Sequence, residues 1–226
     1  MAVKDPTVGL IINKKEKTEK EVLSDDEITK INEFCKTADC GTFVMTLLYT
    51  GLRRGEIAAL TWDDIDFENS IIHVNKAVVF KNNHPIISTP KTKNSVREIP
   101  MLDVLREFLE KYKEKYIEKY GKDIQNKTVF LNGLGNPHTE SSINKFWNKF
   151  QREYNNHYKS EVKFGMHQFR HTFCTMLYNA DVDIKTAQAV LGHSDVSVTL
   201  RVYTHLADKQ KKRSIDKLNE YVVKEY

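Results

Sequence analysis

The stretch "LGHSDVSVTLRVYTHL" at residues 191–206 decides how the fold is assigned. Gly192 ends one helical pattern, and a second pattern begins near Asp195. Tyr203 stands ten residues after His193, which places it about one turn into the second helix. A tyrosine on a helix is most often an ordinary core or surface residue. Only chemical groups brought together from the rest of the chain would make Tyr203 a nucleophile.

The segment "HQFRHTF" at residues 167–173 places His167 and Arg170 three apart, on one face of a predicted helix. Such a pair can offer one phosphate an imidazole and a planar guanidinium that binds two oxygens. Taken alone, a solvated surface pair is the simpler interpretation. His167 and His171 also have the spacing of the HExxH zinc motif, but Gln168 replaces its glutamate. The segment therefore does not predict a metalloprotease site.

Two further basic segments precede this one. "TGLRRGEIAAL" at residues 50–60 puts two arginines at the start of a helix, where backbone N–H groups also point. "PKTKNSVREIP" at residues 90–100 predicts a hairpin tip whose lysines can contact a phosphate or donate a proton. A solvated helix boundary and a lysine-rich turn explain each segment equally well in isolation.

The remaining chain predicts a mainly α protein with one small antiparallel β-sheet, an α+β class. Ser24 with Glu27 forms a capping box at a helix start, and Thr139 caps a later helix. Short β-branched runs between residues 65 and 100 predict the sheet. Residues 1–21 are expected to be a flexible linker, and residues 22–226 one compact domain ending in a short, separate amphipathic helix over 208–226.

Composition narrows the class of protein. The 226 residues are 40% hydrophobic and 29% charged, which suits a soluble globular protein, most simply a cytoplasmic one. No apolar run approaches the roughly 18 residues of a membrane span, and no secretory leader is recognisable. Three irregularly spaced cysteines do not predict a disulfide framework. A net charge of +4 permits a polyanionic partner without requiring one.

In the order Arg, Lys, His-x-x-Arg, His, Tyr, these segments together resemble the tyrosine recombinase family, the phage integrases of conjugative transposons and temperate phages. The resemblance covers about residues 22–215. It implies a catalytic domain that binds duplex DNA as half of a C-shaped clamp. It also implies roles for six residues: Arg53 and Arg170 hold the scissile phosphate, Lys91 is the hairpin lysine with Lys93 as the alternative, His167 and His193 are the two histidines, and Tyr203 is the nucleophile.

The implied reaction needs no cofactor and no metal. The tyrosine hydroxyl attacks phosphorus, giving a 3′-phosphotyrosine and a free 5′-hydroxyl, so the energy of the bond is kept for rejoining. Arg53, Arg170 and His193 are expected to neutralise the charge that builds on the phosphate. His167 is the candidate to accept the tyrosine proton, and Lys91 is the candidate to protonate the leaving oxygen.

Duplex DNA is the expected partner, bound mainly through its backbone and therefore sensitive to salt. The candidate backbone contacts are Arg54, Lys93, Arg97, Lys145 and Lys149. Full-length family members carry a core-binding domain before this region, so the chain is expected to be a catalytic fragment or a minimal relative. A homo-oligomer on DNA, up to a tetramer, is expected, with Val222 and Val223 of the tail docking on a neighbour or packing on their own domain. An accessory directionality factor is a further candidate partner, and a membrane is not expected.

Three rival functions remain open. A type IB topoisomerase-like enzyme would nick and reseal without exchanging strands. A DNA-binding regulator could keep the fold without cutting, although the full set of six residues argues against it. A metal-dependent nuclease would require an acidic cluster that the sequence does not show.

Overall fold

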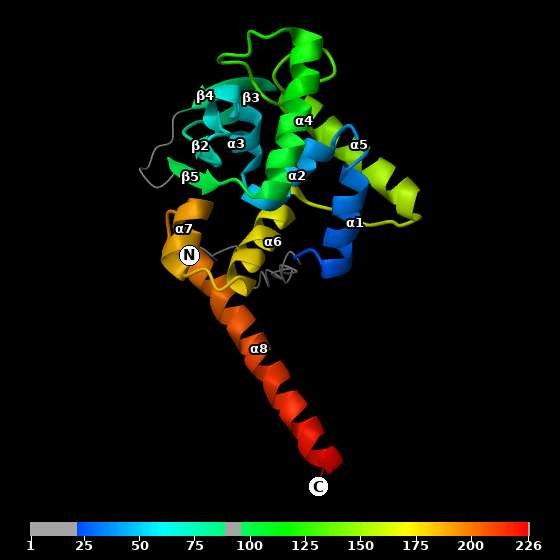
Figure 1. Cartoon of the computed structure of the whole chain (residues 1–226), viewed down its shortest axis with the longest axis vertical. Helices are drawn as coiled ribbons and strands as arrows, with labels where there is room; N and C mark the ends of the chain where they lie inside the picture. Colours follow the sequence, from blue (N-terminus) through cyan, green and yellow to red (C-terminus); the bar gives the residue numbers. More distant parts are fainter. Residues whose placement is uncertain (1–21, 89–95, 226) are drawn as a thin grey trace, which may run out of the picture.

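The computed structural model describes residues 22–88 and 96–225, and Figure 1 shows their arrangement. The fold is mainly α with small antiparallel sheets, which confirms the predicted class. The helices are α1 (Asp25–Cys35), α2 (Gly41–Thr50), α3 (Arg54–Ala59), α4 (Asp103–Tyr120), α5 (Glu140–Tyr158), α6 (Met166–Asn179), α7 (Ile184–Leu191) and α8 (Val196–Glu225), with a short 3₁₀ turn at Trp62–Asp64.

Local signals start and stop several helices, and the two predicted caps at Ser24 and Thr139 are both formed. The Ser24 hydroxyl accepts the Glu27 N–H at 3.2 Å, and the Glu27 carboxylate accepts the Ser24 N–H at 2.8 Å, so the capping box of α1 is complete. Thr139 caps α5 by accepting the Ser142 N–H. Gly121 ends α4 with a positive φ of 89°.

The central element is α2, which packs against α1, α4 and α6. All but one of its residues are buried, and Val44, Leu47 and Leu48 are 0% exposed. A helix that is apolar around its whole circumference needs partners on every side, and α2 has them. Its last turn ends at Gly51, whose carbonyl points into the region where the functional side chains meet.

The predicted single sheet is wrong, because the structure contains two. Strands β1 (Ile65–Asp66), β2 (Ile71–Val74) and β5 (Arg97–Pro100) form a three-stranded antiparallel sheet in the order β1-β2-β5, while β3 (Ala77–Lys81) and β4 (His84–Ser88) form a separate hairpin. Asn75 and Lys76 divide the apolar run, since both bond the Asp64 carboxylate and turn the chain away from the first sheet.

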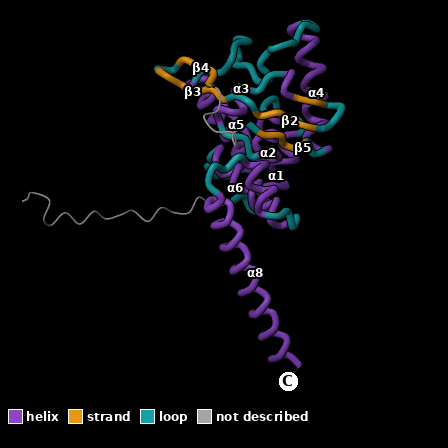
Figure 2. Tube along the Cα trace, turned by 90° about the vertical axis from the view of Figure 1, so that its left-hand side faces the viewer, coloured by secondary structure: helices purple, strands orange, loops and turns teal. Residues whose placement is uncertain are grey.

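The hairpin lies against α3. Its two-residue turn, Asn82 and Asn83, has positive φ at both positions, as a tight hairpin turn requires. A side chain at Gly55 would bring a Cβ within 2.4 Å of the Val78 carbonyl oxygen, so only glycine permits this close approach of β3 to α3. Figure 2 shows the hairpin at the edge of the body. The segment at residues 128–132 forms only isolated bridges.

The C-terminal region differs from the prediction of two helices in a compact domain. One continuous helix, α8, runs from Val196 to Glu225 and its second half leaves the body (Figures 1 and 2). No glycine or proline interrupts residues 196–225, so nothing in the sequence stops the helix. Within residues 22–88 and 96–225, no helix is long and apolar enough to cross a membrane.

Candidate active site

Three arginines from different elements converge on the C-terminal end of α7. Arg97 donates through Nε to the Val190 carbonyl at 2.7 Å, Arg170 donates through Nη2 to the Leu191 carbonyl, and Arg53 donates through Nη2 to the Gly192 carbonyl at 2.9 Å. The last carbonyls of a helix have no partner within the helix and carry its negative end charge. The end of α7 therefore serves as a platform for three cations.

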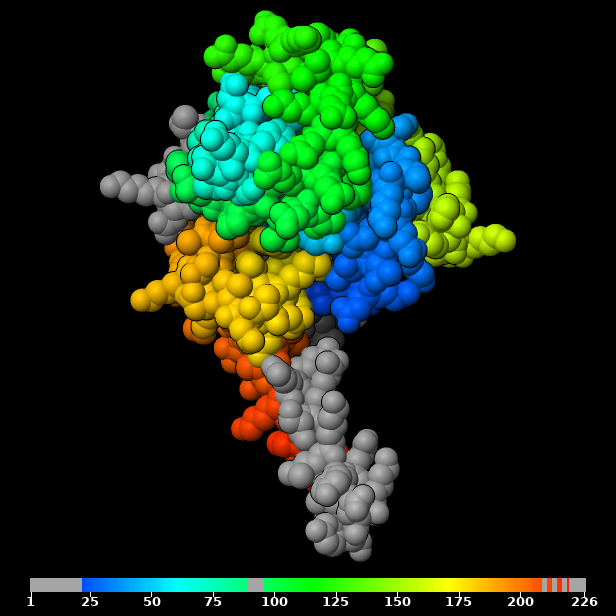
Figure 3. Space-filling model, in the orientation of Figure 1, coloured from blue at the N-terminus to red at the C-terminus, as the bar shows by residue number. Residues whose placement is uncertain are grey.

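Arg170 also joins this platform to the central helix. Its Nη1 donates to the Gly51 carbonyl at 2.7 Å, at the end of α2. The side chain comes from α6, and Figure 3 shows α6 and α7, in yellow and orange, side by side on the surface. Burial and the nearby charge of Arg53 lower the pKa of Arg170 to about 9, so it remains a cation at neutral pH.

A buried carboxylate reduces the repulsion among the three guanidinium groups. Glu56 accepts two hydrogen bonds from Arg97, at 3.0 and 2.8 Å, and one from Arg53 Nη1 at 2.8 Å. Burial alone would raise its pKa, but the hydrogen bonds and charge of Arg97, aided by Arg53, lower the pKa of Glu56 to about 2. Three guanidiniums and one carboxylate leave a net charge of about +2, which suits a phosphate ligand.

Arg97 was expected to contact the DNA backbone, and the structure corrects this. Its side chain is only 4% exposed, because it is enclosed by Glu56 and the end of α7. Strand alternation was the signal that could have found this, since Arg97 shares the inward face of β5 with Ile99. Of the three arginines, Arg53 has the most exposed side chain, at 39%, and is the one placed to meet a ligand first.

His193 follows directly after the platform. Burial, with the charges of Arg170 and Arg53, lowers the pKa of His193 to about 4, so its ring is neutral at pH 7. Its Nδ1 lies 2.7 Å from the hydroxyl of Thr199, a fully buried residue in the first turn of α8. Sequence reasoning did not single out Thr199.

His167 and His171 occupy the first turns of α6. Their rings meet edge to face, with centroids 5.0 Å apart, and His171 is close enough to His193 for its charge to lower the pKa of that ring. Sequence reasoning considered His171 only as a zinc ligand. Across the part of the chain that the structure describes, no three His, Cys, Asp or Glu side chains are grouped to hold a metal ion.

The structure does not bring the Tyr203 hydroxyl to the arginines. Tyr203 is the eighth residue of α8, counted from Val196, so it lies two turns into the helix rather than one. Its side chain is buried, at 7% exposed, against Tyr178, and its hydroxyl donates to the Val182 carbonyl at 3.1 Å. Val182 precedes α7, whereas the arginines bind the far end of that helix, about 12 Å away for its eight residues. Burial raises the pKa of Tyr203 to about 12 in this state.

Of the remaining predicted residues, the three that the structure describes lie at the surface. Lys91 and Lys93 lie outside the described residues. Arg54 pairs with Glu140 at 3.1 Å and lies over the Phe80 ring. Two lysines of α5, Lys145 and Lys149, are exposed. Lys149 pairs with Glu153 and is near Cys40, at the end of α2 opposite the arginine platform.

Comparison with known proteins assigns the chain to a family. The model of the phage integrase family matches residues 21–210, most of the chain. The chain belongs to the phage integrase family. The resemblance inferred from "TGLRRGEIAAL", "HQFRHTFCT" and "LGHSDVSVTLRVYTH" is thereby confirmed.

Curated relatives of this integrase-family chain are longer proteins. A tyrosine recombinase XerC-like protein of Caldanaerobacter subterraneus subsp. tengcongensis is 34% identical, over 91% of this chain and 56% of the relative. The transposase of transposon Tn916 from Enterococcus faecalis is 28% identical, over 89% of this chain and 52% of the relative. The chain thus spans about half the length of these relatives.

Solved structures share the fold of this integrase-family chain. The Tn1549 transposon integrase in complex with transposon right end DNA superposes with a TM-score of 0.75 and 26% identity, over 90% of this chain and 68% of that one. The XerA recombinase gives a TM-score of 0.65 at 26% identity, over 87% of this chain and 64% of that one.

Proposed function

We propose that this chain is the catalytic part of a site-specific recombinase that cuts and rejoins duplex DNA through a covalent bond to Tyr203. The observation that carries the proposal is the arginine platform at the end of α7, with His193 directly after it. A phosphate bound there meets positive charge that is already in place, which is how enzymes stabilise the transition state of phosphoryl transfer. The relatives support the proposal, since the Tn1549 integrase was solved with transposon DNA.

In the proposed reaction the Tyr203 oxygen bonds to phosphorus and the bond from phosphorus to the 5′-oxygen breaks. Arg53, Arg170 and His193 neutralise the charge that develops on the non-bridging oxygens. His167 accepts the tyrosine proton, and Lys91 supplies the proton that the 5′-oxygen needs. The free 5′-hydroxyl, or one from a partner strand, then reverses the step. When the attacking 5′-hydroxyl belongs to a partner duplex, the strands are exchanged, and the result is integration or excision of a mobile element.

Tyr203 must move before it can attack. Its hydroxyl is bonded to Val182 and its pKa is raised to about 12, the wrong direction for a nucleophile. Release from Val182 and approach to the arginines would lower that pKa, because nearby cations favour the ionised form. We therefore propose that the Tyr203 hydroxyl leaves Val182 and reaches the arginines when DNA binds. In that bound state Arg54, Lys93, Lys145 and Lys149 contact the DNA backbone.

Assembly on DNA is part of the same proposal. The second half of α8 leaves the body, and Ile215 on it is 48% exposed. A partly apolar helix without a body beneath it is suited to pack on a neighbouring protomer. We propose a homo-oligomer on DNA, up to a tetramer, in which this tail docks in trans, with a directionality factor as a further partner.

Covalent capture tests the chemistry. Wild type is mixed with nicked suicide duplexes carrying candidate sites, in EDTA, and analysed for an SDS-resistant protein–DNA band. The expected result is a band with wild type and none with Tyr203→Phe. Tyr120→Phe is the matched control, because Tyr120 is a tyrosine on α4, 43% exposed, and should keep the band.

The outcomes separate the rival functions. Clear gel-shift binding without any covalent band would contradict cutting by this chain and favour a DNA-binding regulator. Relaxation of a supercoiled plasmid that carries no candidate site would favour a topoisomerase-like enzyme. Cleavage of the duplex that leaves no covalent band and occurs only when EDTA is omitted would indicate a metal-dependent nuclease.

A further inference from the structure

The hydroxyl of Thr199 has an unusual partner for a buried threonine on a helix. Such hydroxyls commonly donate to the carbonyl four residues earlier, and Thr46 and Thr172 do so at 2.7 and 2.9 Å. Thr199 is 0% exposed, and its hydroxyl instead lies 2.7 Å from Nδ1 of His193. The Thr199 hydroxyl is thus directed away from its own helix and toward the His193 ring, which indicates a role for Thr199 in the site.

The backbone of His193 is already held on both sides. Its N–H donates to the Gln188 carbonyl at 3.2 Å, and the Gln188 side-chain amide donates to the His193 carbonyl at 3.1 Å. What remains adjustable is the rotation of the ring and the position of its proton. Thr199 is placed to determine both, because a hydrogen bond to one ring nitrogen sets what the other nitrogen carries.

The position of that proton decides what His193 can do. Its ring is neutral at pH 7, because burial and the charges of Arg170 and Arg53, with His171 and Arg97 acting in the same direction, lower its pKa. A neutral imidazole has one N–H. If Nδ1 accepts a hydrogen bond from Thr199, the proton is on Nε2 and the ring can donate to a phosphate oxygen. With the proton on Nδ1, Nε2 has no hydrogen to donate.

We propose that Thr199 is a positioning residue whose hydroxyl donates to Nδ1 of His193 and keeps the proton on Nε2, where it can be donated to the scissile phosphate. The inference rests on the proposed recombinase function, because it assigns His193 a phosphate to act on. Thr199 and Tyr203 are four residues apart on the same face of α8. The same two turns of helix therefore carry the residue that orients His193 and the proposed nucleophile.

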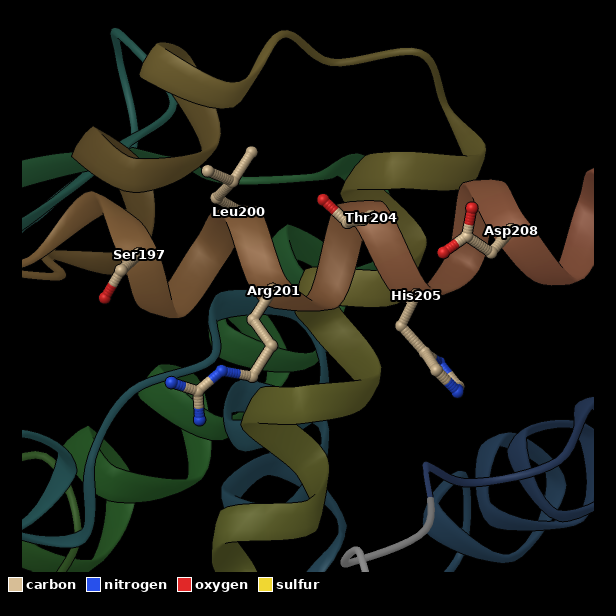
Figure 4. Close-up of a pocket in the computed structure, with 6 residues that line it drawn as sticks. All are labelled: Ser197, Leu200, Arg201, Thr204, His205 and Asp208. Carbon is tan, nitrogen blue, oxygen red and sulfur yellow. The ribbon is translucent and has the colours of Figure 1, made fainter.

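Three variants isolate the hydroxyl. Thr199→Val removes it while conserving volume, and Thr199→Ser keeps it. The matched control is Thr204→Val, the same chemical change five residues further along α8. Thr204 is exposed and lines a shallow surface depression of about 430 Å³, and Figure 4 shows it with the five other residues that line this depression. Thermal unfolding of each variant confirms that it is folded.

The first measurement is spectroscopic and uses the DNA-free chain. Two-bond ¹H–¹⁵N correlation spectra of the ¹⁵N-labelled protein distinguish a protonated ring nitrogen from a bare one, with His193→Gln used to assign the signals. Wild type, Thr199→Ser and Thr204→Val should show the proton on Nε2. Thr199→Val should show a mixture of tautomers or the proton on Nδ1. An unchanged Nε2–H spectrum in Thr199→Val would overturn the proposal.

The second measurement is single-turnover cleavage of the nicked suicide duplex. Thr199→Val should cut about 10- to 100-fold more slowly, a smaller loss than the 100- to 1000-fold typical of removing such a donor outright. Thr199→Ser should restore most of the rate, and Thr204→Val should match wild type. In a His193→Ala background Thr199→Val should add no further loss, because the two residues act as a unit. Full additivity of the two losses, or no rescue by serine, would overturn the proposal.

The two measurements distinguish a failure of this inference from a failure of the proposed function. If wild type forms no covalent complex with any duplex, the recombinase proposal fails. The ring spectrum of the DNA-free chain then still decides whether Thr199 holds the proton on Nε2.

Discussion

Glu56 is the residue on which the charge balance of the arginine platform depends. Its carboxylate is 5% exposed, yet it is ionised because Arg97 and Arg53 surround it with four hydrogen bonds, one of them from the Arg53 backbone N–H at 2.8 Å. A buried charge without such partners would be strongly unfavourable. The cluster is therefore stable only while Glu56 remains a carboxylate.

Acid should weaken the fold through this residue. The pKa of Glu56 is about 2 in the folded chain and near 4.5 when unfolded, so its stabilisation is complete above about pH 4.5 and is lost as pH falls toward 2. The linkage corresponds to about 3 kcal/mol. Urea unfolding from pH 2 to 7 should show the gap between wild type and Glu56→Gln closing over this range. Glu110→Gln, at the exposed pair with Arg106, is the control and should show almost no gap. A gap independent of pH would contradict this assignment.

Gly192 has no side chain because the platform leaves no room for one. Its φ is +66°, and a Cβ would lie 2.8 Å from Nη1 and 2.9 Å from Cδ of Arg97. Gly192→Ala should lower the free energy of unfolding by about 2 to 4 kcal/mol, from backbone strain and displacement of a buried guanidinium. Denaturant unfolding measures this. Gly133→Ala, where a Cβ would meet nothing within 4 Å, should be close to neutral. Equal losses at both glycines would contradict the steric explanation.

At the scale of elements, the end of α7 joins three otherwise separate parts of the chain. Arg53 precedes α3, Arg97 begins β5 and Arg170 belongs to α6, and each donates to a different carbonyl of one helix end. Arg97 also connects β5 to α3 through Glu56. The relative placement of these elements therefore depends on hydrogen bonds as well as on apolar packing.

Loss of Arg97 should destabilise the body more than its position after a surface hairpin suggests. Arg97→Gln leaves the Glu56 charge without its bidentate partner, and breaking a buried pair in this way typically costs about 3 to 5 kcal/mol. Arg97→Lys should recover only part of this, because an ammonium cannot make the two parallel bonds. Denaturant unfolding provides the measurement, with Arg106→Gln at the surface expected to cost less than about 1 kcal/mol. A loss at Arg97 as small as the one at Arg106 would contradict its structural role.

Elements with local signals could be predicted from sequence, and their arrangement could not. The capping boxes and the Asn82–Asn83 turn follow from residues within four positions of one another. The division into two sheets depends on Asn75 and Lys76 meeting Asp64, eleven and twelve residues away. The continuity of α8 could have been predicted, since no helix breaker separates its two halves.

At the scale of the whole molecule, the chain consists of a packed body and a projecting helix (Figure 1). The first turns of α8 belong to the body, where Thr199 and Tyr203 are buried. Beyond Leu206 every side chain of α8 that the structure describes is exposed. The first turns of α8 should therefore contribute to the stability of the body, and the part beyond Leu206 should contribute to assembly.

Truncation after Asp208 tests that separation. The shortened chain should unfold within about 3 °C of wild type, because every described side chain of the removed segment is exposed. It should still form the covalent band on a single-site suicide duplex, yet lose strand transfer on a two-site substrate if the tail docks in trans. Strand transfer at the wild-type level would contradict docking in trans, and a large fall in melting temperature would show that the tail packs on its own body.

Sequence by itself determined the family, the α+β class and the identities of the candidate residues, because short motifs and local hydrogen bonds depend on neighbours along the chain. Only the tertiary structure decided what those residues do in the free protein. It buried Arg97, enclosed Arg170, tied the Tyr203 hydroxyl to Val182 and set Thr199 against His193. The decisive bonds of the arginines join residues 139, 119 and 41 positions apart. Contacts over such separations arise only when the core brings distant segments together.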